Sequence, residues 1–169
     1  LTSMLFRKYF PSSVINCYEP NENLKKYLKN NSTEGNFDFF FEAVGNKSGK
    51  VKLNTDKKES ILTFVSNDPK GTTPIISFNE ALKRFKNETI DIVKMDSEGS
   101  EWEILKDKKS WKNIKFLTME YHLEKDKYDH QRIISYLDEI GFKAITKINY
   151  STKANYGMVL AYNTLKISI

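Results

Sequence analysis

The run IDIVKMDSEGSEWEIL, residues 90–105, changes its hydrophobic period within a few residues and so constrains the possible fold strongly. Its first part, Ile90 to Met95, is a short apolar run rich in β-branched residues, which is typical of a strand buried on both faces of a parallel sheet. In its second part Trp102 and Leu105 stand three residues apart, which is typical of a helix. The run predicts a strand that leads directly into a helix, and open α/β sheets bind their ligands at such strand ends.

Acidic residues gather where the predicted strand ends and the predicted helix begins. Asp96 follows the strand, and Glu98 and Glu101 fall in the first turn of the helix. One interpretation is a binding or catalytic site at this edge of the sheet. The other is that Glu98 and Glu101 only complement the helix dipole and Asp96 only caps the helix. The spacing alone does not separate the two.

Strands and helices alternate along the rest of the chain, which is the signature of βαβ units and a largely parallel sheet. Further strands are predicted over residues 13–18, 39–44, 50–53, 61–65, 116–121, 142–148 and 158–162. The pair 50–53 and 61–65 is expected to form a hairpin or small meander. One helix is predicted after Asn21, with Leu24, Tyr27 and Leu28 on one face. A second is predicted after a capping box at Ser77 to Glu80, and a third near residues 128–140, where Gly141 ends the helix.

Composition favours one globular domain over residues 1–169, with 39% hydrophobic residues for its core. Its apolar runs fall far short of the roughly 20 residues of a membrane helix, and no signal-peptide pattern is present, so we expect a soluble, cytoplasmic protein. The single cysteine, Cys17, excludes an internal disulfide and a multi-cysteine zinc site. The net charge of +5 comes from scattered lysines without a recognised nucleic-acid-binding motif, so solvated helix faces explain it better than a nucleic-acid partner.

Residues 90–101, IDIVKMDSEGSE, resemble the signature of the FkbM-type methyltransferases, which use S-adenosylmethionine. Residues 17–23, CYEPNEN, resemble the second strand and following turn of that family. Ala43 and Val44, with the glycines that follow, resemble its third strand, and residues 120–122, EYH, resemble its fifth strand. The resemblance runs from about residue 13 to about residue 142. It implies an α/β fold with a Rossmann-like, doubly wound, mostly parallel sheet of the class I methyltransferase type.

The resemblance also implies a set of cofactor-binding residues. It makes Glu19 the acid that binds the ribose of S-adenosylmethionine, because a carboxylate at the end of the second strand of a doubly wound sheet can accept both ribose hydroxyl protons. The alternative for Glu19 is a helix-initiating Glu-Pro-Asn turn. The other cofactor-binding residues implied are Pro20, Asn21, Ala43, Val44, Asp96 and Glu98.

The amino end departs from the family pattern. The family's first strand and glycine-rich turn, which hold the methionine part of the cofactor, should precede Leu1, and Leu1, Met4 and Leu5 resemble the tail of the helix that follows. That strand is central in this topology, so its loss should leave two unsatisfied sheet edges. We therefore expect an N-terminally incomplete domain whose first strand, and with it part of the cofactor site, is missing from this sequence.

Methyl transfer to a hydroxyl requires alignment of the reacting atoms and removal of a proton. His122 is the better candidate for the base, since an unperturbed histidine has a pKa of about 6.5, with Asp96 and Glu120 as further catalytic residues that orient the acceptor. A structural histidine satisfied by backbone groups is the alternative. Asp96, Glu98 and Glu120 could instead hold a divalent ion, but we expect no metal, because the cationic amine of the cofactor should lie beside these acids. His130 is expected to be solvated.

The sequence therefore predicts an S-adenosylmethionine-dependent methyltransferase that methylates an oxygen atom of a small molecule or sugar. The choice of oxygen rests on the resemblance only. The alternative from another class is a catalytically inert module of the same fold that binds an adenosine nucleotide or a protein. A nucleic-acid-modifying or nucleic-acid-binding protein is a third hypothesis, and it predicts lysines gathered on one face beside Asp96.

Overall fold

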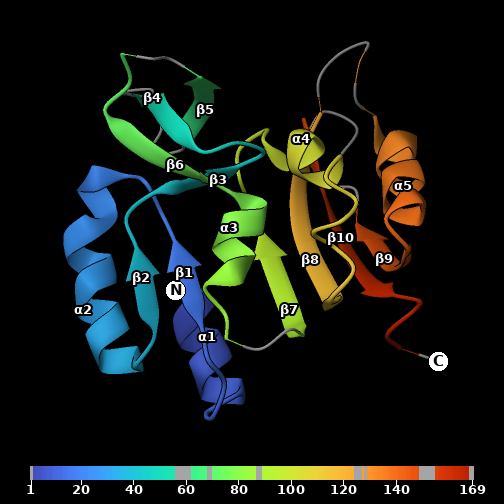
Figure 1. Cartoon of the computed structure of the whole chain (residues 1–169), viewed down its shortest axis with the longest axis horizontal. Coiled ribbons are helices and arrows are strands. Elements are labelled where there is room, and N and C mark those ends of the chain that lie inside the picture. The colour runs from blue at the N-terminus through green and yellow to red at the C-terminus, as the bar shows by residue number, and fades with distance from the viewer. Residues whose placement is uncertain are drawn as a thin grey trace. The chain divides into compact units, whose positions relative to one another are not determined.

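The computed structural model describes residues 2–55, 62–67, 70–86, 89–123, 127, 129–148 and 155–167 (Figure 1). The chain forms two compact units. One comprises Leu1–Val44 with Ser48–Ile76, and the other comprises Gly45–Lys47 with Ser77–Ile169. None of the helices among the described residues is both long and apolar enough to cross a membrane.

The first unit contains a parallel strand pair and a mixed set of short strands. Its elements are α1 (Thr2–Tyr9), β1 (Asn16–Tyr18), the 3₁₀ helix η1 (Glu22–Leu24), α2 (Lys25–Gly35), β2 (Asp38–Phe40), β3 (Ala43–Gly45), β4 (Gly49–Thr55), β5 (Leu62–Asn67) and β6 (Thr73–Ser77). Strand β1 pairs with β2 in parallel, and a four-stranded sheet has the order β3-β6-β4-β5, in which β4 is antiparallel to both β5 and β6. The predicted strands 50–53 and 61–65 thus correspond to the antiparallel pair β4–β5, and residues 56–61 between them lie outside the described residues.

Arg7 connects α1 to the carboxyl end of α2. Its Nε donates to the Gly35 carbonyl at 2.8 Å and its Nη2 donates to the Asn36 carbonyl at 2.6 Å. The last carbonyls of a helix lack partners within the helix and carry its negative dipole end, so a guanidinium satisfies them well. Residues 2–9 form a helix, as the resemblance of Met4 and Leu5 to the tail of a helix implies. Leu1 lies outside the described residues.

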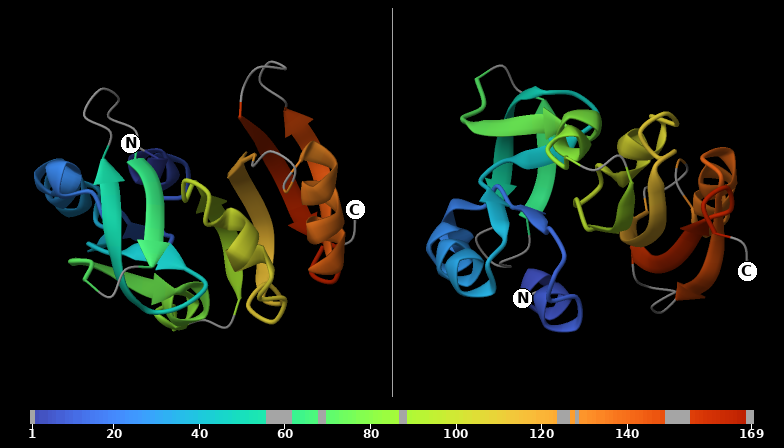
Figure 2. Two further views of the ribbon diagram at one scale, coloured as in Figure 1. Left: turned by 90° about the horizontal axis from the view of Figure 1, so that it is seen from above. Right: turned by 60° about the horizontal axis from the view of Figure 1, so that its bottom comes forward.

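The second unit is a four-stranded sheet with helices on its flank. Its elements are α3 (Phe78–Lys83), β7 (Ile90–Met95), α4 (Glu101–Leu105), β8 (Ile114–His122), α5 (His130–Glu139), β9 (Phe142–Ile148) and β10 (Tyr156–Asn163). The strand order is β7-β8-β10-β9, with β7 parallel to β8 and β10 antiparallel to both of its neighbours. Figure 2 shows α5 lying along β9.

Helix starts and stops in this unit follow the predicted signals. The Ser77 hydroxyl accepts a hydrogen bond from the Glu80 amide at 3.3 Å and donates one to the Glu80 carboxylate at 2.9 Å, so Ser77 caps α3. Asp129 caps α5, and Gly141 follows that helix with a φ of 83°, which favours glycine. The predicted helix begins at His130 in the structure, and residue 128 lies outside the described residues.

The core of the second unit is built from aromatic and aliphatic side chains of the sheet, α4 and α5. Trp102 packs edge-on against Tyr121, with ring centroids 6.2 Å apart, and against Tyr136, at 5.8 Å. The side chains of this core that are at most 1% exposed include Trp102, Trp111, Tyr121, Phe142, Ile104, Leu105, Ile114, Leu117, Ile133 and Leu137.

Several sequence predictions need correction. The sheets are mixed rather than mostly parallel: β1–β2 and β7–β8 are parallel, whereas β10 is antiparallel to β8 and β9, and β4 is antiparallel to β5 and β6. Strand β7, the last strand of its sheet among the described residues, is not buried on both faces, since Ile92 is 36% exposed. Residues 39–44 form parts of two strands in different sheets. On the predicted apolar helix face, Leu24 and Tyr27 are exposed.

Candidate functional site

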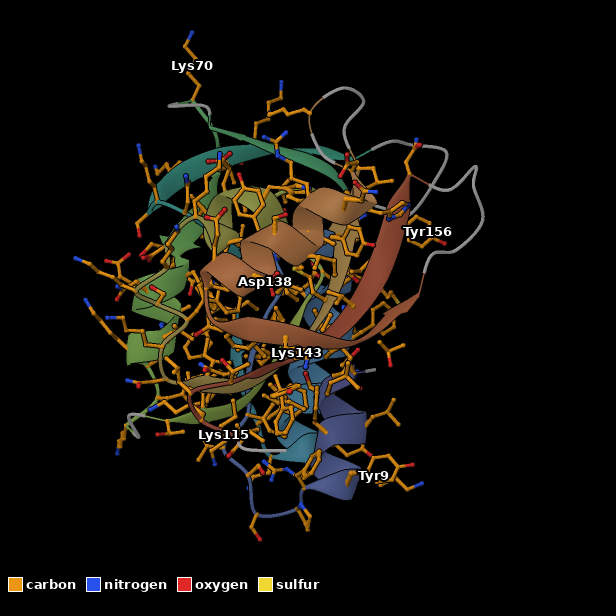
Figure 3. All side chains as sticks on the ribbon, turned by 90° about the vertical axis from the view of Figure 1, so that its right-hand side faces the viewer. Tyr9, Lys70, Lys115, Asp138, Lys143 and Tyr156 are labelled. Atoms are coloured by element: carbon orange, nitrogen blue, oxygen red, sulfur yellow. The ribbon has the colours of Figure 1, made fainter. Side chains whose placement is uncertain are left out.

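The carboxyl ends of β7 and β8 lie side by side because the two strands are parallel. Met95 pairs with Met119, so Asp96 and Glu120, which follow them, lie at the same edge of the sheet. His122 is the last residue of β8, and it pairs with Tyr156 at the start of β10. Figure 3 shows Tyr156 and Lys115 toward opposite ends of this sheet. The predicted convergence of residues at this edge is therefore present in the structure.

Strand β8 presents alternate side chains to opposite faces of the sheet. Met119 and Tyr121 are fully buried, whereas Glu120 and His122 are half-buried. Glu120 and His122 therefore share one face, and Tyr121 lies on the other. The Tyr121 hydroxyl and His130 Nδ1 form a hydrogen bond of 2.9 Å, so His130 is a partner of a buried phenol rather than the solvated residue that we predicted.

Residues 96–100 form a tight turn between β7 and α4 with two residues in the left-handed region. The φ angle is 50° at Glu98 and 100° at Gly99. Glycine adopts such angles readily, but glutamate adopts them at a cost on the order of 1 kcal/mol or more. Backbone strain of this kind persists only where the surrounding structure enforces it, and it is concentrated at functional sites.

The buried side chain of Glu101 holds this turn together. Its Oε1 accepts hydrogen bonds from the Ser97 amide at 2.8 Å and from the Ser97 hydroxyl at 3.1 Å, and its Oε2 accepts one from the Gly99 amide at 2.9 Å. Glu101 is fully buried although it is the first residue of α4. A buried charge is tolerated only with such partners.

The imidazole of His122 lies among three carboxylates. Its Nε2 is 3.3 Å from Glu98 Oε2 and 3.7 Å from Glu120 Oε1, and its Nδ1 is 3.5 Å from Glu101 Oε1. The backbone carbonyl of His122 accepts a hydrogen bond of 2.6 Å from the Trp102 indole N–H. The imidazole is 25% exposed, so one edge can reach a ligand.

This arrangement shifts the proton affinities of the cluster. The Glu101 carboxylate, 3.5 Å from Nδ1, raises the pKa of His122 more than burial lowers it, and Glu98 and Glu120 add to the rise. Burial raises the pKa of Glu98 and of Glu120, with a further rise from neighbouring carboxylates, while His122 opposes the shift in both. A histidine held between carboxylates is suited to accept a proton and to retain it.

Asp96, Glu120 and His122 also have the spacing of a cation site. One potential ligand atom from each lies within 4.8 Å of the others. However, the Lys94 ammonium lies 2.8 Å from Asp96 Oδ2, which already gives that carboxylate a cationic partner. The side chains of Lys94 and Asp96 are 30% and 35% exposed, so this pair is weak and could be displaced.

The predicted ribose acid, Glu19, belongs to the first unit and follows the carboxyl end of β1. Its Oε1 accepts a hydrogen bond of 2.9 Å from the Asn21 amide, and Asn21 in turn caps η1 through its side chain. The turn-forming interpretation of Glu19 is thus present in the structure, and it leaves the ribose-binding interpretation open, because a carboxylate accepts several hydrogen bonds. Pro20 lies in the same turn.

The other two predicted residues of the first unit belong to β3. Ala43 is buried with Val51 and Ile75 in a small apolar cluster, and Val44 is half-buried. Ala43 could therefore offer a ligand its backbone groups rather than its methyl group. The structure describes the predicted site residues in two sets: Asp96, Glu98, Glu120 and His122 in the second unit, and Glu19, Pro20, Asn21, Ala43 and Val44 in the first.

The alternative explanation of the acidic turn as an ordinary helix start is wrong in two respects. Ser100, not Asp96, is the N-cap residue of α4, and Glu101 binds the turn from a buried position. The sequence reasoning missed Glu101 as a residue of the site. The available signal was its spacing of three and four residues from Ile104 and Leu105, which places it on the apolar face of the helix.

Comparison with known proteins points to one family. The family model described as "Methyltransferase FkbM domain" matches residues 2–144. No curated protein matches the chain. Among solved structures, the chain is similar to a "putative RNA methyltransferase PH1948 from Pyrococcus horikoshii", with 15% identity and a TM-score of 0.44. That match covers 88% of this chain, and the chain spans 61% of the other protein.

Proposed function

This chain belongs to the methyltransferase FkbM domain family, and we therefore propose that it transfers the methyl group of S-adenosylmethionine to an oxygen atom of a small molecule or sugar. The observation that carries the proposal is the meeting of Asp96, Glu98, Glu120 and His122 at the carboxyl ends of two parallel strands. We further propose that residues 1–169 belong to one Rossmann-like, doubly wound methyltransferase domain.

Within this proposal His122 is the general base. Its Nε2 edge lies toward Glu98 and Glu120, and a neutral imidazole there removes the proton of an acceptor hydroxyl as the oxygen attacks. Asp96 and Glu120 accept hydrogen bonds from hydroxyl groups of the substrate that receives the methyl group, and they orient this substrate for in-line displacement. The neighbouring carboxylates then stabilise the imidazolium that results.

The residues present fit S-adenosylmethionine by the chemistry of their donor and acceptor groups. A carboxylate at a strand end, as at Glu19, suits a ribose diol, and the acids Asp96 and Glu98 suit a cationic amine. When bound, the cofactor supplies an electrophilic methyl group. Cofactor binding is tested by calorimetric titration of the full-length protein with S-adenosylmethionine, and the absence of measurable binding would contradict the proposed function.

Replacement of Glu19 by alanine in the full-length protein is expected to weaken S-adenosylmethionine binding by about 1–3 kcal/mol, the scale for lost charge-assisted hydrogen bonds. Calorimetry measures the change. Because Glu19 Oε1 also accepts the Asn21 amide, Glu19→Gln serves as a second variant that retains an oxygen for this turn. Glu22→Ala, which removes an exposed acid three residues away, is the matched control. Unchanged affinity in both Glu19 variants would remove this residue from the site.

Methyl transfer is expected to persist in the presence of a chelator such as EDTA. Lys94 partly offsets the charge of Asp96, and the proposed proton transfer uses His122 without an ion. The measurement is turnover of the acceptor, identified by screening hydroxyl compounds, in chelator and after magnesium is added back. Activity that is lost in chelator and restored by magnesium would assign the cluster to a cation instead.

A further inference from the structure

Glu101 contacts His122 as well as the turn between β7 and α4. Its carboxylate is fully buried and is shared between the turn at Ser97 and Gly99 on one side and the imidazole of His122 on the other. A carboxylate needed only to complement a helix dipole could stay in water. Because burial of a charge is costly, the position of Glu101 calls for partners, and the His122 imidazole, 3.5 Å away, is an ionisable one.

The contact leaves one atom of the imidazole in an unusual state. His122 Nδ1 is buried, and among the described residues it is the one buried side-chain nitrogen or oxygen without a hydrogen-bond partner of ordinary geometry. Glu101 Oε1 lies 3.5 Å away. Buried polar atoms are normally paired, so a small movement of the ring or the carboxylate that closes this distance is favourable.

Glu101 determines which of the two imidazole nitrogens of His122 carries the proton. A neutral imidazole has a donor N–H at one nitrogen and an acceptor lone pair at the other. A lone pair at buried Nδ1 would face the negative Oε1 of Glu101, whereas an N–H at Nδ1 would donate to it. The lone pair is then at Nε2. The carboxylates nearest to Nε2, Glu98 and Glu120, are 29% and 28% exposed, so water screens their charge, whereas Glu101 beside Nδ1 is fully buried.

We propose that Glu101 is a positioning residue that holds His122 in the Nδ1–H tautomer while it holds the Ser97–Gly99 turn that carries Glu98. The consequence for catalysis rests on the proposed function, because only an Nε2 lone pair lets His122 accept a proton from an acceptor hydroxyl at the exposed edge. The tautomer itself is a property of the protein alone.

Nitrogen-15 NMR of histidine-labelled protein tests the proposal. The chain contains two histidines, and His130→Gln assigns the signals of His122. At a pH high enough to make the His122 imidazole neutral, we expect a pyrrole-type signal for His122 Nδ1 and a pyridine-type signal for Nε2. In Glu101→Gln the Nδ1–H signal of His122 should be lost in favour of the tautomer ratio of an unconstrained imidazole.

Two controls separate positioning from general disturbance of the turn. Ser97→Ala removes a hydroxyl donor to Oε1 of Glu101 but leaves the charge of Glu101 in place. Glu103→Gln replaces a glutamate by glutamine two residues further along α4. Both should keep the Nδ1–H tautomer, and Glu101→Asp should restore part of it. An Nε2–H tautomer in the unmodified protein, or one unchanged by Glu101→Gln, would overturn the proposal. If Glu101→Gln does not fold, the tautomer of His122 in the unmodified protein still tests the proposal.

The NMR measurement needs neither the cofactor nor the acceptor, so its failure can be told apart from failure of the proposed function. An Nδ1–H tautomer in a protein whose His122→Ala variant remains fully active would uphold the positioning by Glu101 and reject His122 as the base. An Nε2–H tautomer in a protein that loses activity on His122→Ala would do the reverse.

Discussion

Replacing His122 with alanine is expected to lower the turnover number of the full-length enzyme by about 10²- to 10⁴-fold, the usual cost of a lost general base. The imidazole is the group in the cluster whose neutral form is a good base near neutral pH, because the surrounding groups are carboxylates that are weaker bases. Substitution should change turnover with little effect on S-adenosylmethionine affinity. The measurement is steady-state kinetics with the identified acceptor, together with calorimetry of cofactor binding.

His130→Ala is the matched control, because it removes the other histidine, which bonds Tyr121 on the opposite face of β8. The pH profile adds a second readout. A base must be unprotonated, so the turnover of the unmodified enzyme should rise with pH through a pKa above the ordinary histidine value, since Glu101 and its neighbours raise it. His122→Ala should abolish this rise. Full activity in His122→Ala would reduce His122 to a structural residue.

The strand-to-helix junction was predictable from sequence because short-range signals define it. The change of period at residues 90–105, the serine cap before α3 and the glycine after α5 each act within a few residues. The convergence of Asp96 and Glu120 was predictable too, because parallel strands joined by a crossover end at one edge. Such features depend on local backbone preferences and on the geometry of a βαβ unit.

Features that depend on tertiary neighbours were not predictable from sequence alone. The apolar residues of β7 suggested burial on both faces, yet burial of a face depends on which elements pack over it, and Ile92 is partly exposed. The run 39–44 is apolar except for Glu42, so its hydrophobic period alone did not mark the break between β2 and β3. The charge of Glu101 suggested a solvated helix start, whereas its burial follows from amide donors at Ser97 and Gly99 that appear only when the turn forms.

Trp102 links the core to the candidate site, and Trp102→Ala is expected to lower the free energy of unfolding by about 3–5 kcal/mol. The indole is 1% exposed and packs against Tyr121 and Tyr136, so alanine would leave a large cavity. The variant also removes the donor to the His122 carbonyl. Chemical denaturation followed by circular dichroism measures the loss.

Trp102→Phe separates the two contributions of this side chain. Phenylalanine retains most of the aromatic packing but cannot donate to the His122 carbonyl, so the expected loss is about 1–3 kcal/mol, the cost of an unsatisfied buried acceptor. Leu165→Ala, at a position that is 83% exposed, should change stability by no more than about 0.5 kcal/mol. A Trp102→Ala variant as stable as Leu165→Ala would show that α4 does not anchor the carboxyl end of β8. Because the indole bonds the backbone of His122 itself, Trp102→Phe should also lower turnover while the protein stays folded.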